Sequence, residues 1–284
     1  MAIVKFGDIV RDVKINVDRA NNPYEHYVAG DHMDSEDLTI HRYGSFETDD
    51  VGPAFTRIFK PGQILYGSRR TYLKKVAVAD FEGICANTTF VLESKDEALF
   101  DNRLLPFIML SDAFTRWSIA HSKGSTNPYV LFSDLADYEF DLPPLAEQKV
   151  LADKLWAAYR LKESYKKLLV ATEEMVKSQF IEMFGGGNWP QKTLGEVGSF
   201  TRGGGFQKSD FVEHGIPCIH YGQIHTKFGP FITTHITEIS SDLESKTKFA
   251  STGDLIIAIT SEDAEGSCKS TAWLGDYPVA VGGH

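Results

Sequence analysis

Long hydrophobic runs, cysteines and positive charge are all scarce in this chain of 284 residues. No stretch of about 18 consecutive apolar residues occurs, which excludes a membrane-spanning helix. The N-terminus lacks the basic start and apolar stretch of a secretory signal. The three cysteines, Cys85, Cys218 and Cys268, are odd in number and far apart. We therefore expect a cytoplasmic protein without a disulfide framework or a zinc site.

The formal net charge is −10, which argues against the simplest signature of a nucleic-acid-binding domain. Salt screens charges beyond about 10 Å, however, so the local distribution matters more than the sum. Residues 51–79 and 113–133 contain no Asp or Glu. Their basic side chains are Arg57, Lys60, Arg69, Arg70, Lys74 and Lys75 in the first stretch, and Arg116, His121 and Lys123 in the second. This pattern predicts a basic patch on an acidic protein, with an unevenly charged ordinary surface as the alternative.

The first half of the chain is predicted to be mixed and mostly β. Short runs of β-branched and aromatic residues, broken by Gly and Pro, predict strands at 63–66, 75–79 and 88–92. Residues 99–119 have apolar side chains at roughly helical spacing, and Pro106 favours a helix start nearby.

A change of character follows at Leu142-Pro143-Pro144-Leu145. From Leu145 to about Phe184 there is neither Pro nor Gly, and apolar side chains recur at heptad-like spacing. Forty residues of helix make a rod about 60 Å long, which cannot bury such a stripe alone and needs a partner helix. The residues predicted to pair are Leu151, Leu155, Tyr165, Leu169, Val176, Phe180 and Met183. The glycines at 185–187 are predicted to end the helix.

The segment after the glycines repeats short patterns of the first. Residues 6–10 resemble 194–198, residues 61–66 resemble 252–257, and residues 81–86 resemble 277–282. Three weak matches in the same order predict one domain type used twice. The second copy stops where the first would be near Thr88, so we expect it to be incomplete.

Several motifs resemble type I restriction–modification specificity subunits. The sequence at 141–150, Asp-Leu-Pro-Pro-Leu-Ala-Glu-Gln-Lys-Val, is similar to that family's junction between a target recognition domain and its conserved helix. Residues 177–185 are similar to the hinge into the second domain, and residues 67–77 and 81–86 resemble the family's basic strand–turn segment.

The resemblance implies an α+β fold. A mixed, β-rich target recognition domain is expected at 1–142, a coiled-coil spacer helix at 143–185, and an incomplete second recognition domain at 186–284.

It also implies a function without catalysis in this chain. Each recognition domain of such a subunit reads one half of a split site in double-stranded DNA. The helices set the spacing and dock the methyltransferase subunits, and the restriction subunit joins indirectly. S-adenosylmethionine is expected on the methyltransferase partner, and no membrane is involved. A full subunit has two domains and two helices, so this chain is either a homodimer paired through its helix or an inactive truncation.

Candidate DNA contacts follow from the basic stretches. Arginine forks match guanine edges and phosphates, and Arg69 and Arg70 come after a Gly-Ser turn. The loop 122–127 combines small polar groups with a lysine. The residues predicted to face DNA are Ser68, Arg69, Arg70, Tyr72, Lys74, Lys75, Lys123, Ser125, Asn127 and Arg202. The alternatives are a solvated strand edge and a plain surface loop.

Signals for catalysis or metal binding are weak. Asn127-Pro128-Tyr129 lacks the second proline of a DNA methyltransferase site. The run 203–205 is glycine without the Lys-Ser/Thr of a phosphate loop, and predicts a flexible turn beside Arg202. His220 and His225 have no paired cysteine ligand, so no metal site is predicted. A coiled-coil scaffold that binds other proteins is the alternative function, and a methyltransferase in its own right is a third.

Overall fold

The structure is a computed structural model that describes residues 2–187, 189–261 and 266–283. The chain divides into two compact units, Met1–Gly185 and Gly186–His284. None of the helices in the described ranges is both long enough and apolar enough to span a lipid bilayer.

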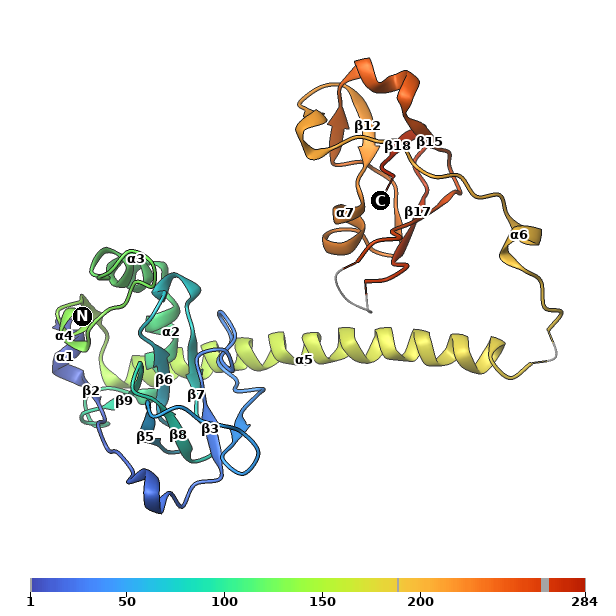
Figure 1. Cartoon of the computed structure of the whole chain (residues 1–284). Helices are drawn as coiled ribbons and strands as arrows, with labels where there is room; N and C mark the ends of the chain where they lie inside the picture. The colour runs from blue at the N-terminus through green and yellow to red at the C-terminus, as the bar shows by residue number, and fades with distance from the viewer. Residues whose placement is uncertain (1, 188, 262–265, 284) are drawn as a thin grey trace. The chain divides into compact units, whose positions relative to one another are not determined.

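The first unit contains two four-stranded sheets and a two-stranded ribbon (Figure 1). One sheet has the order β2-β9-β6-β7, the other β4-β3-β8-β5, and β1 pairs with β10. All pairings are antiparallel except β3 with β8. The strands are β1 (Ala2–Lys5), β2 (Val10–Asp12), β3 (His26–Val28), β4 (Gly44–Ser45), β5 (Phe55–Phe59), β6 (Ile64–Gly67), β7 (Val76–Val78), β8 (Gly83–Ala86), β9 (Thr89–Ser94) and β10 (Glu139–Leu142). The strands predicted at 63–66, 75–79 and 88–92 are confirmed as β6, β7 and β9.

Strand β6 has both faces buried, because side chains alternate along a strand. Ile64 and Tyr66 belong to a core under the helices, whereas Leu65 belongs to a second core shared with Val28 and Phe59 of the other sheet. The sheet that contains β6 is therefore a middle layer, which explains why its sequence is a continuous apolar run.

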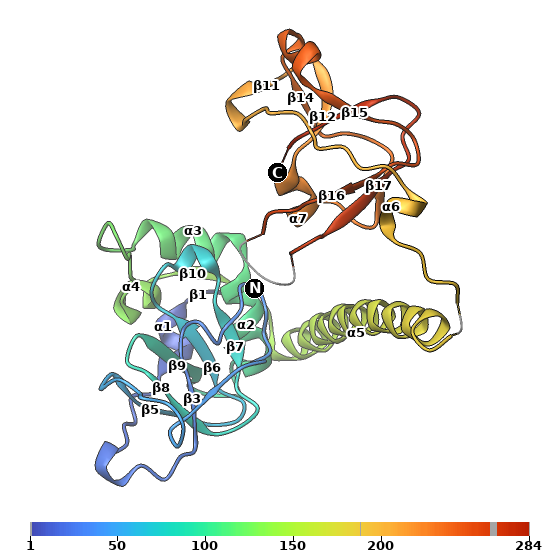
Figure 2. The ribbon, with the colours of Figure 1, turned by 45° about the vertical axis from the view of Figure 1, so that its right-hand side comes forward.

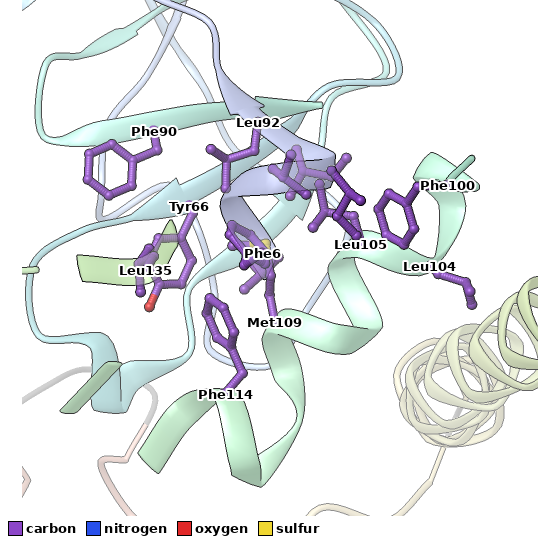
Figure 3. Close-up of a cluster of buried hydrophobic side chains, with 14 of the residues drawn as sticks. Phe6, Tyr66, Phe90, Leu92, Phe100, Leu104, Leu105, Met109, Phe114 and Leu135 are labelled. Atoms are coloured by element: carbon purple, nitrogen blue, oxygen red, sulfur yellow. The ribbon is translucent and has the colours of Figure 1, made fainter. Parts of the chain in front are cut away.

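Helices cover the outer face of this middle layer. They are α1 (Phe6–Ile9), α2 (Leu105–Leu110), α3 (Asp112–Ala120), α4 (Phe132–Ala136) and the start of α5 (Leu145–Phe184), with 3-10 turns η2 (Thr71–Leu73) and η3 (Asn102–Leu104). A further 3-10 turn, η1 (Arg19–Asn21), has no buried residue. In Figure 3 the side chains of Phe6, Tyr66, Met109, Phe114 and Leu135 converge from strand and helices on one core.

The predicted helical stretch 99–119 is two helices rather than one. Ser111 has an extended backbone (ψ 149°), and its hydroxyl accepts a hydrogen bond from the amide of Phe114, which caps α3. The helical spacing of apolar residues continues across the break because both helices bury their faces in the same core. Pro106 lies in the first turn of α2, as expected.

Helix α5 is a single element of 40 residues, which confirms the prediction from the heptad-like spacing. Its first half packs on the rest of the first unit: Gln148 and Ala152 are buried, and Leu155, Trp156 and Tyr159 pack against the core. From residue 167 to 184 every side chain is exposed. Figures 1 and 2 show α5 running outward from the domain. At about 1.5 Å per residue, the projecting part is ~27 Å long.

The second unit has a five-stranded sheet, order β11-β14-β12-β18-β15, and a three-stranded sheet, order β13-β17-β16. Its strands are β11 (Phe211–Val212), β12 (Ile216–Ile219), β13 (Phe231–Ile232), β14 (Thr237–Ile239), β15 (Lys248–Ala250), β16 (Leu255–Ile257), β17 (Ser270–Trp273) and β18 (Val279–Val281). The other elements are α6 (Leu194–Val197), α7 (Tyr221–Thr226), η4 (Lys208–Asp210) and η5 (Ser241–Lys246).

The topology shows that the second unit repeats part of the first. The order β14-β12-β18-β15 matches β4-β3-β8-β5, and in each the two central strands are parallel while their outer neighbours are antiparallel. The four-residue helices α1 and α6 coincide with the first predicted match. Before the equivalent strands β6 and β16, Gly62 (φ 86°) and Gly253 (φ 94°) both adopt the left-handed conformation that glycine favours.

Candidate nucleic-acid interface

The two acid-free stretches of the sequence meet in the structure. The backbone after β6 pairs with the segment before α4: the Arg70 amide donates to the Pro128 carbonyl (2.7 Å), and the Val130 amide donates to the Ser68 carbonyl (3.0 Å). Residues 68–75, here called the recognition segment, therefore lie beside residues 123–129, here called the recognition loop. This arrangement places candidate side chains from both stretches on one surface.

The recognition loop is closed by its own pairing. Lys123 and Tyr129 exchange both backbone hydrogen bonds, at 2.7 and 2.9 Å. Gly124 has φ 85°, which makes the reversal possible. Between these ends, Ser125 and Asn127 are exposed. The loop is therefore a short rigid projection beside Arg69.

Arg69 and Arg70 are both exposed, as predicted. Across the described ranges, neither arginine has a carboxylate within ion-pair distance. Arg70 has φ 49° and begins the 3-10 turn η2, on which Tyr72 is 53% exposed. Two guanidinium groups and one aromatic ring thus face solvent within four residues of each other.

The turn η2 is held in place by α3 and by the core next to it. Thr71 is buried, its hydroxyl lies 3.4 Å from that of Ser122, and η2 packs on α3. Burial raises the pKa of Tyr66 to about 12, and its hydroxyl interacts with Ser118 and Thr71. These contacts fix the backbone of the turn that carries the exposed arginines.

Three residues that were predicted to contact DNA bind other groups of the protein instead. Ser68 is buried (6% exposed) and its hydroxyl donates to the Thr88 carbonyl at 2.6 Å, so it is a structural residue here. Lys74 lies between Glu36 (2.8 Å) and Asp112 (3.1 Å), and hydrogen bonds to these carboxylates raise its pKa. The Lys75 ammonium donates to the Gly30 carbonyl.

Lys123 is in an intermediate state. It pairs with Asp134 at 2.9 Å, yet its side chain is 49% exposed. An ion pair of this kind contributes about 0–1 kcal/mol to stability, so a phosphate can take the place of the carboxylate. Lys123 therefore remains available to a polyanion.

Arg202 belongs to the second unit and is exposed, with Nε donating to the Gly283 carbonyl at 3.2 Å. The glycines beside it do not form the flexible turn that the sequence predicts. Gly204 pairs with Gly282, and a Cβ on Gly203 would lie 2.3 Å from the Gly282 carbonyl oxygen. These glycines allow two backbones to pack together.

Two exposed residues of this surface, Tyr129 and Arg116, were not among the predicted DNA contacts, although Arg116 belongs to the predicted basic patch. Tyr129 is 41% exposed and pairs with both Arg69 and Lys123 through its backbone. Arg116 is exposed on α3, the helix that packs on η2. An aromatic residue inside an acid-free stretch was the available signal for Tyr129.

The predicted helix-pairing residues separate into two groups. Leu155 packs against the core of its own domain, so its prediction as a pairing residue is wrong. The others are exposed: Leu151 44%, Tyr165 60%, Leu169 67%, Val176 62%, Phe180 64% and Met183 54%. Leu168 (59%) and Met175 (62%) extend the apolar surface of the projecting part.

One group of side chains has the composition of a metal site. The ligand atoms of Asp37, His41 and Glu163 lie within 4.8 Å of one another. However, the ammonium of Lys166 lies 3.0 Å from Asp37 and 2.8 Å from Glu163, so a lysine already neutralises both carboxylates. The group is an ion-pair network.

The fold and this surface together define a class: a mixed recognition domain with exposed guanidinium groups, joined to a long helix and followed by a partial repeat of the domain. The model for the type I restriction modification DNA specificity domain matches residues 21–171, and the chain belongs to this family.

Relatives and solved structures agree with this assignment. The specificity subunit of the type I restriction enzyme EcoDI from Escherichia coli is 30% identical over 148 residues, which are 52% of this chain and 32% of that subunit. The chain thus spans about a third of that relative's length. The crystal structure of the HsdS subunit from Thermoanaerobacter tengcongensis has a TM-score of 0.50 at 21% identity, over 99% of this chain and 73% of that one. A chain from a study of assembly and conformational transition in a type I R-M system gives 0.55, with the same identity and coverage. The structural likeness shows the shared α+β fold.

Proposed function

We propose that this chain is a non-catalytic DNA-recognition component of a type I restriction–modification complex. Its first unit reads one half of a bipartite site in double-stranded DNA. The observation that carries the proposal is the meeting of the recognition segment and the recognition loop, with the unpaired guanidinium groups of Arg69 and Arg70 at their junction, inside the region that the family model matches.

The chemistry of this surface suits duplex DNA. Arginine donates in a bidentate manner to guanine O6 and N7 and also binds phosphate. The amide of Asn127 and the hydroxyl of Ser125 add donors and acceptors that pair with base edges. Lys123 supplies a mobile charge for the backbone. A chain of net charge −10 thus presents a cationic surface only where the acids are absent or already paired.

The projecting half of α5 supports the rest of the proposal. Its exposed apolar side chains are a docking surface for methyltransferase subunits or for the helix of a second copy. The restriction subunit joins the complex indirectly. S-adenosylmethionine belongs to the methyltransferase partner. In this chain the nearest methyltransferase-like motif, Asn127-Pro128-Tyr129, is part of the recognition loop, and the Pro128 carbonyl accepts the Arg70 amide.

A salt titration of duplex binding tests the proposal. The full chain, alone and co-expressed with a candidate methyltransferase subunit, is titrated with a random-sequence duplex pool by fluorescence anisotropy. Phosphate contacts make log K fall linearly with log[salt], by about 0.9 per phosphate. Bound duplexes are then selected and sequenced to recover the half site.

The exposed stripe on α5 and the acidic net charge also favour a second candidate, a coiled-coil scaffold that binds other proteins. A scaffold shows no duplex affinity even at low salt, and that result rejects the DNA proposal. Heat on mixing the chain alone with S-adenosylmethionine in a calorimeter identifies instead a methyltransferase in its own right.

A further inference from the structure

A short loop connects the recognition segment to the helix. Residues 36–39, here called the bridging loop, contact the recognition segment on one side. The Glu36 amide donates to the Lys74 carbonyl (3.1 Å), and the Glu36 carboxylate pairs with the Lys74 ammonium (2.8 Å). The Val78 amide of β7 donates to the Leu38 carbonyl (2.8 Å). The bridging loop is therefore an added edge beside β7 and the segment that precedes it.

The opposite side of the bridging loop is bound by Tyr159 of α5. The Tyr159 hydroxyl donates to Asp37 Oδ1 (2.7 Å), accepts from the Leu38 amide (2.9 Å) and lies 3.0 Å from the Thr39 hydroxyl. Burial and the neighbouring Asp37 raise the pKa of Tyr159 to about 12, so the hydroxyl keeps its proton. One side-chain oxygen thus joins the helix to three consecutive residues of the loop.

A lysine about two helical turns further along the same face of α5 completes the connection. The Lys166 ammonium lies 3.0 Å from Asp37 Oδ2 and 2.8 Å from Glu163. Asp37 is only 6% exposed, and although burial opposes it, hydrogen bonds from Tyr159, Thr39 and Lys166 hold the pKa of this carboxyl well below its usual range. A buried carboxylate fully hydrogen-bonded in this way resists displacement, because an uncompensated buried charge is costly.

The position of these contacts along α5 gives them their importance. Among the described residues, Lys166 is the last residue of α5 with an ion pair to the domain, and residues 167–184 beyond it are all exposed. The projecting part is a lever of about 27 Å, so a tilt of about 10° at its base moves its tip by ~5 Å. One base pair advances duplex DNA by about 3.4 Å. A tilt of this size exceeds one base-pair step, so discrimination between adjacent site spacings requires a rigid junction.

The geometry points to Tyr159, Asp37 and Lys166 as positioning residues: they form a latch that fixes the direction of α5 relative to the recognition segment and thereby the spacing between the two DNA half sites. The inference rests on the proposed function for its consequence in DNA, but the latch itself is testable without DNA.

The DNA-free test measures the direction of the helix. Spin labels are placed on exposed Lys60 and Lys177 after both are changed to Cys, with exposed Cys268 changed to Ser; Cys85 and Cys218 are buried. Double electron–electron resonance gives the distribution of distances between the recognition domain and the projecting helix. We expect a narrow distribution in the parent chain.

The variants are Tyr159→Phe and Lys166→Met, with the matched control Lys167→Met on the exposed surface of the same helix. We expect each latch variant to widen the distribution at least twofold while the control leaves it unchanged. Equal widths in all four proteins overturn the latch, and so does widening in the control, which would show a general loss of helix rigidity.

The consequence in DNA is measured in the complex with the methyltransferase subunit. A latch variant should bind an isolated half site within about twofold of the parent but lose at least fivefold of its preference between spacers that differ by one base pair. A parallel loss of half-site affinity contradicts a positioning role. Failure of the parent to bind any duplex rejects the proposed function and leaves the resonance result to decide the latch.

Discussion

Replacing Arg69 or Arg70 by Ala should weaken binding of the specific duplex without unfolding the protein. Both side chains are exposed, and in the part of the chain that the structure describes neither is held by a carboxylate. Their removal therefore breaks no ion pair, and the change in unfolding free energy should stay within about 0.5 kcal/mol, as for other surface substitutions.

The size of the effect distinguishes two kinds of contact. If the arginine reads a base, the loss is ~1–3 kcal/mol, or about 5- to 150-fold in Kd, and is confined to the specific sequence. If it holds a phosphate, affinity falls about equally for all sequences and the salt slope decreases by ~0.9. Fluorescence anisotropy with the selected and a scrambled duplex, at several salt concentrations, separates these outcomes.

Two controls make the measurement decisive. Lys60 is exposed in the turn that leads into β6, whereas Arg69 follows the other end of that strand, so Lys60→Ala should bind normally. Lys74→Ala removes a cation that Glu36 and Asp112 already neutralise, so its effect on duplex affinity should be smaller than that of either arginine. Unchanged affinity in both arginine variants, or equal losses with Lys60→Ala, would refute the assignment of this surface.

Three further outcomes follow from the packing. Leu169→Glu should abolish self-association or partner capture in sedimentation and leave Tm unchanged, because Leu169 is 67% exposed. Leu155→Glu should instead lower Tm, because Leu155 packs on the domain core. The pKa of Asp37 is lower in the folded chain than its unfolded value of about 3.9. The ionised carboxylate therefore contributes its full stabilisation of the fold above a pH of about 3.9, and this stabilisation is lost as the pH falls from there towards the folded pKa. Asp37→Asn should therefore lose less Tm than the parent between pH 5 and pH 3, and an identical loss contradicts the hydrogen-bonded carboxylate. Gly203→Ala should destabilise the second unit, seen as a lower melting transition, whereas Gly205→Ala, which has open space around it, should not.

The spacing of apolar residues and the positions of Pro and Gly were sufficient to predict most of the fold. The unbroken run after Pro144 gives a continuous helix because nothing in 40 residues interrupts its hydrogen bonds. The repeat was visible because the same turn chemistry, a glycine with positive φ before a strand, recurs at Gly62 and Gly253. The break at Ser111 was missed because a capping serine interrupts the backbone without interrupting the apolar pattern.

The candidate site was predicted less completely, because ion pairing depends on contacts between distant parts of the sequence. Asp112 and Asp134 border the second acid-free stretch, and both fold back onto predicted DNA contacts, as partners of Lys74 and Lys123. Ser68 was misread because the side chain after a strand end can point either into the core or out of it, and here its hydroxyl satisfies the Thr88 carbonyl. Arg69 and Arg70 are exposed, as expected for side chains that follow a Gly-Ser turn at the end of a strand.

The left-handed conformation of Arg70 has a consequence for how this site balances folding against binding. A residue with a Cβ at φ 49° costs roughly 1–2 kcal/mol that glycine would not. The turn should therefore tolerate Arg70→Gly and gain stability, but the variant would lack one guanidinium group of the proposed DNA-contact surface. At this position the backbone conformation favours glycine, whereas the proposed contact with DNA requires arginine. Measuring both the unfolding free energy and the duplex affinity of Arg70→Gly shows how much stability the free protein gives up for binding.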